Sequence, residues 1–408
     1  MSWREADYPD SLHVVNLHKT SAWIRDTLDP LMAREGPNEL QPDDVLTLHD
    51  IFLDLQHHQI SLATMKFSRI HLAVSDVCGK ATRWPKKLAD EADRVIMCLE
   101  SYYGPLETIR TPLYEVGGRL HGISEPRHWT RDALLRRFSE EDPSLTDNTR
   151  AYSHSSLGFK PGQWWINGLF AFRDGIIDDK CTDGGICYNE RGAYAVVLTD
   201  DDETNNLSPD KFTYRSRTGD RGRFRLTSAD FRSRFPTRLL RSNTLKSLWA
   251  PRAGIRYDGL FKIIGWTIRP VKADENEGVD VMFEVHFERF DDADSNELLR
   301  HPLAEEVDDY KAYKRSCEEQ RDAERHASPL KSSELNLNRK DFQEQFRRPS
   351  QKAEDFVLRE EEKVGQYSSL HREEVVDFTA KTRTYDGSTE DSPRFYEVEW
   401  NPPPHRKL

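Results

Sequence analysis

The sequence predicts an α+β protein with a helical N-terminal bundle, a curved sheet or barrel, and a charged C-terminal region. Apolar residues recur at helical spacing over residues 1–150, and short alternating apolar runs replace them from Gly158 onward. Beyond residue 292, 46 of 116 residues are charged. These changes divide the 408-residue chain into a helical domain at 1–139, a linker at 140–157, a sheet domain at 158–292 and a charged tail at 293–408.

Three long segments and one short one in the helical domain carry helix start and stop signals. Pro42 opens the first segment, Ser61 caps the second with Gly79 as its stop, Trp84-Pro85 precedes the third with Gly104 as its stop, and Thr130 begins the short one. Short breaks between helices with one apolar face each predict a small bundle. His57, His58 and His71 fall in this region without a carboxylate or cysteine at metal-ligand spacing, so we expect them on the surface or in helix packing.

The segment at 140–157 is rich in Ser, Thr and Asp, which is typical of a linker. After it, three runs alternate apolar and polar residues and predict strands of a largely antiparallel, curved sheet: Ala193–Leu198, Leu260–Ile268 and Val281–Phe287. In the tail, 304–326 and 352–364 have the composition of solvated helices. Neither has a wide apolar stripe, so we expect the tail to be partly helical or disordered.

Charge and cysteine usage narrow the function classes. The net charge is −12, yet residues 211–256 hold thirteen Lys or Arg against only Asp220 and Asp230, and a local basic stripe suits a phosphate backbone. The five cysteines form no C-x-x-C pair, which favours a reducing compartment and argues against a zinc-binding domain. No apolar run reaches the length of a membrane span, and we expect no membrane association.

Residues 158–292 contain an ordered series of short motifs. These are Gly162–Trp165, Gly184–Ile186, Gly192–Leu198, Phe212–Tyr214, Pro236–Arg241, Trp249–Pro251, Arg256–Phe261 with its Tyr-Asp-Gly, and Phe283–Arg289. In this order they resemble the SRA family, also called YDG after the Tyr-Asp-Gly signature. The resemblance covers about a third of the chain and leaves the helical domain and the tail unexplained.

The resemblance implies a PUA-like SRA β-barrel that flips a cytosine out of duplex DNA and reads its modification. A base can be read on all sides only after it leaves the stack. Family members stack the flipped base between two tyrosines, and an aspartate accepts a hydrogen bond from its exocyclic amine. The resemblance places Tyr214 on the second tyrosine, Asp202 where the first normally stands, and Asn205 on the aspartate.

These positions depart from the family pattern in one stacking wall and in the acceptor. An aromatic wall contributes roughly 1–3 kcal/mol per base, so its replacement by Asp202 weakens the predicted pocket. The Asn205 carbonyl can still accept from a cytosine amine, and its NH2 group can donate to thymine. A shifted loop would let Asp202 or Glu203 supply the acceptor instead. Tyr214 has an alternative role as an ordinary core tyrosine, and Asn205 as an ordinary loop residue.

The remaining predicted contacts are with the DNA backbone or groove. The family's long insert after the Phe-Thr-Tyr strand is reduced here to 215–235, which carries alternating arginines: Arg215, Arg217, Arg221, Arg223 and Arg225. The family's thumb loop corresponds to Thr182-Asp183. Tyr257 and Asp258 belong to the signature, and we expect them to hold a turn.

Three functions follow from these residues. The first is a non-catalytic reader of 5-methylcytosine in the nucleus, with double-stranded DNA as partner and chromatin proteins bound by the helical domain or the tail. The second is an SRA-fold protein with a degenerate pocket, acting as a general DNA-binding or protein-interaction module. The third is an enzyme, which the absence of nuclease, RING or methyltransferase motifs in the flanks disfavours. No cofactor and no metal site are predicted.

Overall fold

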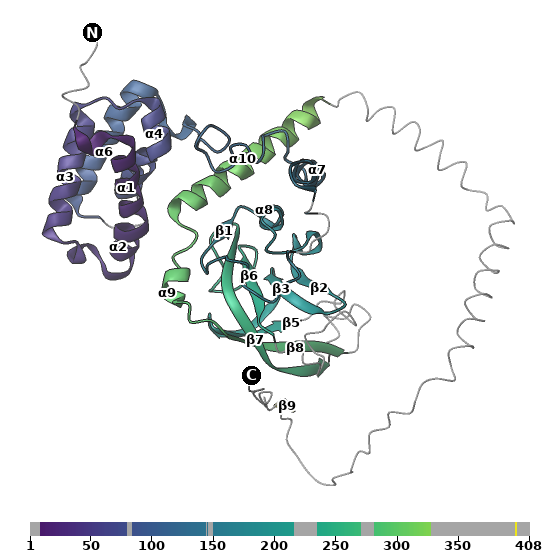
Figure 1. The fold of residues 1–408 in the computed structure, drawn as a ribbon. Coiled ribbons are helices and arrows are strands. Elements are labelled where there is room, and N and C mark those ends of the chain that lie inside the picture. Colours follow the sequence, from purple (N-terminus) through teal and green to yellow (C-terminus); the bar gives the residue numbers. More distant parts are fainter. Residues whose placement is uncertain are drawn as a thin grey trace, which may run out of the picture. The chain divides into compact units, whose positions relative to one another are not determined.

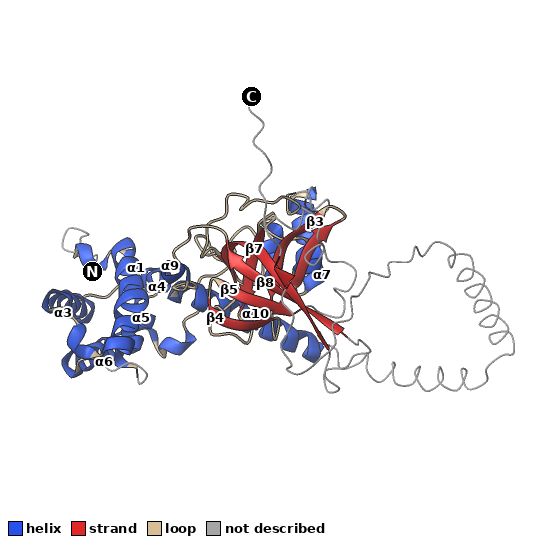
Figure 2. Ribbon diagram, turned by 90° about the horizontal axis from the view of Figure 1, so that it is seen from below, coloured by secondary structure: helices blue, strands red, loops and turns tan. Residues whose placement is uncertain are grey.

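The structure is a computed structural model, shown in Figure 1. It describes residues 9–79, 84–143, 145, 150–215, 235–270, 281–327 and 396–397. Helices dominate the first part of the chain and strands the second (Figure 2), so the predicted α+β class is confirmed.

The helices before residue 142 outnumber the four that the sequence predicts. They are α1 (Val14–Trp23), the π-helical turn η3 (Ile24–Leu28), α2 (Asp29–Glu35), α3 (Pro42–His57), α4 (Leu62–Ser68), α5 (Ile70–Cys78), α6 (Lys86–Tyr103) and α7 (Arg131–Glu141). The predicted starts of α3, α4, α6 and α7 are confirmed within one residue. The hydroxyls of Ser61 and Thr130 cap their helices by accepting N–H bonds from Thr64 and Ala133.

The helix predicted from Ser61 to Gly79 is interrupted. Arg69 has φ 57°, in the left-handed region, and separates α4 from α5. A non-glycine residue in this conformation is strained and needs surrounding contacts to hold it. The Arg69 guanidinium supplies such contacts, because it bonds the carbonyl of Glu305 and the carboxylate of Asp309. The break is therefore fixed by residues more than 230 positions away.

The helices α1 to α6 enclose a hydrophobic core of their own, which we call the bundle core. Its buried residues run from Leu12 to Leu106 and include Phe52, Val74 and Val95, all fully buried. His71 lies within this bundle at 4% exposure, which agrees with the packing role expected for it.

The middle of the chain forms one mixed, nine-stranded sheet. Its strands are β1 (Trp164–Trp165), β2 (Gly185–Asn189), β3 (Gly192–Leu198), β4 (Glu203–Ser208), β5 (Lys211–Arg215), β6 (Thr237–Ser242), β7 (Ile255–Pro270), β8 (Val281–Arg289) and β9 (Tyr396–Glu397). The order along the sheet is β2-β3-β6-β7-β8-β5-β4, and β1 and β9 both pair with β7. The three predicted strands are confirmed as β3, β7 and β8.

The sheet does not close into the PUA-like barrel that the resemblance implies, and it matches the expected alternative of a largely antiparallel sheet. Strands β2 and β4 stand at the two ends of the path and do not pair with each other in the described residues, so the sheet stays open. The pairing is antiparallel except between β3 and β6, which are parallel. The short hairpin β4–β5 pairs onto β8 only, and its far strand β4 is left as an edge.

The Tyr-Asp-Gly signature does not form the predicted turn. It lies inside β7, where the register against β6 shifts between Leu239 and Leu240 and leaves Asp258 as the extra residue of a β-bulge. Gly259 has φ 108°, and a Cβ atom there would stand 2.4 Å from an Asp291 carboxylate oxygen. Only glycine fits this conformation and this approach.

A second core lies along the sheet and includes residues from both sides of the predicted boundary at 139. Leu134 and Phe138 of α7 pack with Phe170 of α8 (Gly168–Arg173) and with Tyr257. Part of the predicted linker is also fixed: the buried Arg238 side chain donates hydrogen bonds to the carbonyls of Ala151, Ser153 and Ser155. Residues 150–157 are thus attached to β6 where we expected a linker.

The start of the predicted charged tail belongs to the fold. After the short α9 (Ser295–Leu298), helix α10 spans Ala304–Ala327, and its Tyr313 and Cys317 are buried in the second core. Asp308 and Asp309 are buried as well, because arginines of other segments neutralise them. Weak order was expected because the segment lacks a wide apolar stripe. Instead, a narrow stripe that includes Val307, Tyr310, Tyr313 and Cys317 packs on the second core, and the ion pairs of Asp308 and Asp309 add to it. The segment 352–364 lies outside the described residues.

Candidate nucleic-acid interface

The hairpin β4–β5 and the turn before it contain five of the predicted site residues. Glu203 is the cross-strand partner of Tyr214, and the N–H of Arg215 donates to the carbonyl of Asp202 at 2.8 Å. Asn205 follows two positions after Glu203 on the same strand. Residues that face each other across a hairpin have Cβ atoms roughly 5 Å apart, so the Glu203 and Tyr214 side chains lie close together.

Asp202 stabilises the turn before β4. Its carboxylate accepts a hydrogen bond from the Thr199 N–H at 2.9 Å, and the side chain is buried. An aspartate that bonds a backbone N–H a few residues away fixes a loop locally. The carboxylate that replaces the first stacking tyrosine therefore acts within its own loop in this structure.

Glu203 is buried, and its two carboxylate oxygens differ in their hydrogen bonding. Its side chain has no exposed surface, and Oε1 accepts a hydrogen bond from Arg241 at 2.7 Å. The second oxygen, Oε2, is buried and has no hydrogen-bond partner among the described residues. A buried acceptor without a partner costs about 1–3 kcal/mol, and such an atom calls for an explanation.

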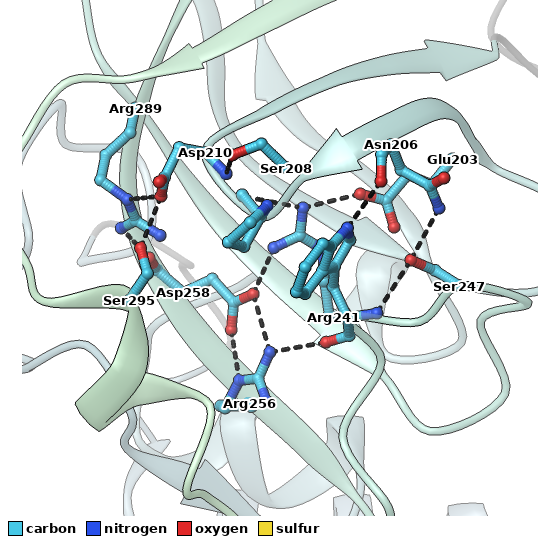
Figure 3. A network of polar contacts seen from close by, with 12 residues as sticks. Glu203, Asn206, Ser208, Asp210, Arg241, Ser247, Arg256, Asp258, Arg289 and Ser295 are labelled. Atoms are coloured by element: carbon cyan, nitrogen blue, oxygen red, sulfur yellow. Dashed lines mark hydrogen bonds and ion pairs between the residues drawn. The ribbon is translucent and has the colours of Figure 1, made fainter.

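Figure 3 shows the ion-pair network that holds Glu203. Arg241 bonds Glu203 on one side and Asp258 on the other, and Asp258 also accepts from Arg256 at 2.6 Å. All four side chains are at most 1% exposed. Two cations and two anions balance, as buried charges require. Burial would raise the pKa of Asp258, but Arg256 and Arg241 hold it below its usual value.

Tyr214 and Asn205 have opposite exposures. Tyr214 is fully buried and packs in a cluster with Phe212, Leu239 and Phe261. Asn205 is exposed and has φ 51°, a left-handed conformation that asparagine tolerates better than most residues. The structure therefore places Asn205 at the surface of the hairpin and Tyr214 beneath it. Whether either contacts a base stays a prediction.

The predicted thumb loop is held by the helical part of the chain. Arg131, the first residue of α7, donates to the hydroxyl of Thr182 and pairs with Asp183 at 3.0 Å. Thr182 is buried, whereas the Asp183 side chain is 87% exposed. Arg215 is half-buried at the end of β5. The other predicted backbone contacts lie outside the described residues: Arg217, Arg221, Arg223 and Arg225.

Sequence reasoning did not single out the arginines that organise this region. Arg241 is the last residue of one motif and Arg256 the first of another. Arg256 lies two residues before Asp258, but nothing in the linear pattern shows that both arginines are almost fully buried. Across the ranges that the structure describes, no group of three His, Cys, Asp or Glu side chains is arranged to hold a metal ion. No described helix is long and apolar enough to cross a membrane.

Two solved structures are similar to part of this chain, both at low identity and a low TM-score. The TagI modification-dependent restriction endonuclease aligns over 33% of this chain and 51% of its own, with 20% identity and a TM-score of 0.27. SUVH6 of Arabidopsis thaliana, solved in complex with SAM, aligns over 43% of this chain and 34% of its own, with 17% identity and a TM-score of 0.29. This chain therefore spans about half and a third of those two chains. No family model and no curated protein matches the chain.

Proposed function

We propose that this protein is a non-catalytic DNA-binding module that reads a modified cytosine, 5-methylcytosine, after flipping it from the duplex. The observation that carries the proposal is the β4–β5 hairpin. It gathers Glu203, Asn205 and Tyr214, and it leaves the buried Glu203 Oε2 without a partner. A cytosine amine is a donor of the kind that such an acceptor lacks.

The base-recognition surface then consists of acceptors and one ring. Asn205 at the exposed end and Glu203 Oε2 at the buried end supply the acceptors, and Tyr214 supplies the aromatic face. Because Tyr214 is buried, a base reaches its ring only after side chains of the hairpin move apart. Unstacking a base costs a few kcal/mol, so the contacts with the base must offset both the unstacking and the movement of these side chains.

The remaining parts of the proposal concern the backbone, the location and the chemistry. The stripe from Arg215 to Arg225 supplies phosphate or groove contacts to an otherwise acidic chain. We place the protein in the nucleus, where its DNA is, with chromatin proteins as further partners of the flanking regions.

We propose no catalysis. Incubation of duplex DNA with the protein and Mg²⁺ should leave the DNA uncut, and cleavage of the DNA would refute the proposal that the protein is non-catalytic.

Titration of matched duplexes that carry fully methylated, hemimethylated or unmodified CpG tests the central claim. A reader should bind at least one modified duplex several-fold more tightly, since one specific contact is worth about 1–3 kcal/mol. Equal affinity for all three duplexes would refute methyl reading.

Two variants connect the preference to the hairpin. Tyr214→Leu removes the aromatic face and should reduce the preference, whereas Tyr214→Phe keeps the ring and should retain it. Asn205→Gly suits the left-handed backbone and removes the exposed acceptor, so it should lower affinity for cytosine without loss of stability. A methyl preference that survives both Tyr214→Leu and Asn205→Gly would show that the base is bound elsewhere.

A second function has an observation in its favour. Asp202 stands in place of a stacking tyrosine and bonds its own loop, so the pocket has one aromatic wall at most. The alternative is a sequence-independent DNA-binding or protein-interaction module. Replacement of Arg221, Arg223 and Arg225 by alanine would then remove DNA affinity and salt dependence, while no modified duplex would be preferred to begin with.

A further inference from the structure

A cavity of about 670 Å³ lies away from the β4–β5 hairpin and is lined by two parts of the chain. One wall comes from η3 and α2 of the helical bundle, with Asp26 and Arg34. The other comes from the loop 248–252 that follows β6 and from the segment between α9 and α10, with Arg252 and Arg300. A volume of this size is in the range of ligand sites.

The lining is cationic. It contains four arginines and a single carboxylate, that of Asp26. Arg256 is neutralised by Asp258, and Asp26 accepts a hydrogen bond from the N–H of Ala304. In the described chain, Arg252 and Arg300 make no ion pair within 4.0 Å, and both are exposed. The two guanidinium groups at the rim are therefore available to an anion from solution.

Hydrogen bonds from Arg256 fix the wall of the cavity formed by the loop 248–252 and by the segment between α9 and α10. The buried Arg256 donates to the carbonyl of Trp249 at 2.7 Å and to that of His301 at 2.9 Å. It therefore holds both the loop 248–252 and the segment between α9 and α10. Figure 3 shows the same Arg256 joined to the network of Asp258 and Arg241. A site held by such hydrogen bonds loses less entropy on binding than a mobile one.

The cavity is joined to the candidate base-reading loop through the same segment. The N–H of Lys246 donates to the carbonyl of Asp200 at 2.7 Å, and the Trp249 indole donates to the carbonyl of Asn206 at 2.7 Å. Residues 246–249 thus contact the loop before β4 and also lead into the cavity wall. The neighbours of Asn205 and the lining of the cavity therefore share the segment 246–249.

We propose that this cavity binds the phosphodiester backbone of the same DNA, with Arg252 and Arg300 as its phosphate contacts. The inference rests on the proposed DNA-binding function and extends it to a second site, to which the helical bundle contributes. Guanidinium groups pair with phosphate oxygens in a two-pronged geometry, which suits this ligand. A chain of net charge −12 needs such local cationic sites to hold a polyanion.

The experiment uses the full chain and a duplex of roughly two helical turns, about 20 base pairs. Arg252→Ala/Arg300→Ala should weaken DNA binding about tenfold at low salt. The negative slope of log K against log salt should become shallower by about 1–2, since each lost phosphate contact contributes about 0.9. Arg94→Ala/Arg127→Ala removes the same charge from exposed arginines outside the cavity and should leave the slope unchanged. Identical slopes for the two double variants would overturn the proposal.

Two further arms complete the test. Arg252→Lys/Arg300→Lys should retain most of the slope, because a lysine still contacts phosphate as a point charge. If inorganic phosphate or a mononucleotide stabilises the wild type but not the double alanine variant, while their DNA titrations coincide, the cavity takes a free phosphate and the backbone assignment is wrong.

The methylation preference separates this inference from the proposed function. A cavity that binds only backbone leaves the ratio of modified to unmodified affinities unchanged in Arg252→Ala/Arg300→Ala. If the wild type shows no methyl preference but the two double variants still differ in salt slope, base reading is refuted and the second site is supported. Retained methyl preference without a slope difference would do the reverse.

Discussion

At the residue scale, Asp258 of the Tyr-Asp-Gly motif serves as a buried countercharge. Its two carboxylate oxygens accept hydrogen bonds from Arg241 and Arg256, and the three side chains are nearly inaccessible to solvent. Arg256 in turn holds the carbonyls of Trp249 and His301. The aspartate therefore stabilises the candidate site through two arginines and does not itself face solvent.

Asp258→Asn should lower the free energy of unfolding at neutral pH by about 3–5 kcal/mol, because it leaves Arg241 and Arg256 short of a buried countercharge. The folded-state pKa of Asp258 lies below the unfolded value of about 3.9, so the carboxylate's contribution is present above that pH and is lost as pH falls through the folded pKa. Urea titrations at neutral and acidic pH measure this. The difference between wild type and variant should shrink in acid.

Asp201→Asn is the matched control, since its carboxylate is exposed and pairs with the exposed Lys246. Its effect should stay within about 0.5 kcal/mol. A comparable loss in both variants would show that the network contributes nothing special.

A second residue-scale prediction concerns His71 in the bundle core. Burial lowers its pKa to about 4, so the folded state resists protonation. The unfolded histidine takes up a proton near pH 6.5, and wild-type stability should therefore fall between about pH 6.5 and about 4. His71→Gln should flatten this part of the pH profile, whereas His57→Gln, at an exposed position, should not. Equal acid dependence in wild type and His71→Gln would contradict the assignment.

At the scale of elements, helix α10 is held by buried ion pairs as well as by a narrow apolar stripe. Arg69 and Arg119 both contact Asp309, each at 2.7 Å, and Arg25 contacts Asp308. About one turn after Asp309, α10 places Tyr313 against the Phe170 ring. One charged helix is thus packed against arginines before residue 120 and against the second core.

Asp309→Asn should destabilise the chain by about 3 kcal/mol and speed amide exchange along α10, because two arginines lose a buried partner. Glu318→Gln, exposed on the same helix, is the control and should change neither quantity measurably. Unchanged exchange in Asp309→Asn would mean that Tyr313 and Cys317 suffice to hold the helix.

At the scale of the molecule, the two cores differ in how far they depend on the rest of the chain. The bundle core is complete within residues 12–106. The second core draws on α7, α8, the sheet and α10. We therefore expect the first to fold alone and the second to need residues on both sides of the sheet.

Expression of two fragments tests this. Residues 9–110 should give a helical circular dichroism spectrum and a cooperative thermal transition. Residues 111–327 lose Arg25 and Arg69, so Asp308 and Asp309 keep only part of their countercharge, and this fragment should melt below the full chain. Asp308→Asn/Asp309→Asn within that fragment should restore part of the difference. A fragment 111–327 as stable as the full chain would contradict the role given to these pairs.

The sequence by itself determined the α+β class, the starts of α3, α4, α6 and α7, the strands β3, β7 and β8, and the motif series of the sheet, because periodicity and capping are local. The tertiary structure alone decided the open sheet, the break at Arg69, the order of α10 and the burial of Tyr214. Each of these depends on partners far apart in the chain, as the contact between Arg69 and Asp309 illustrates. The rim of Arg252 and Arg300 belongs to the same class, since only folding brings it to face Arg34.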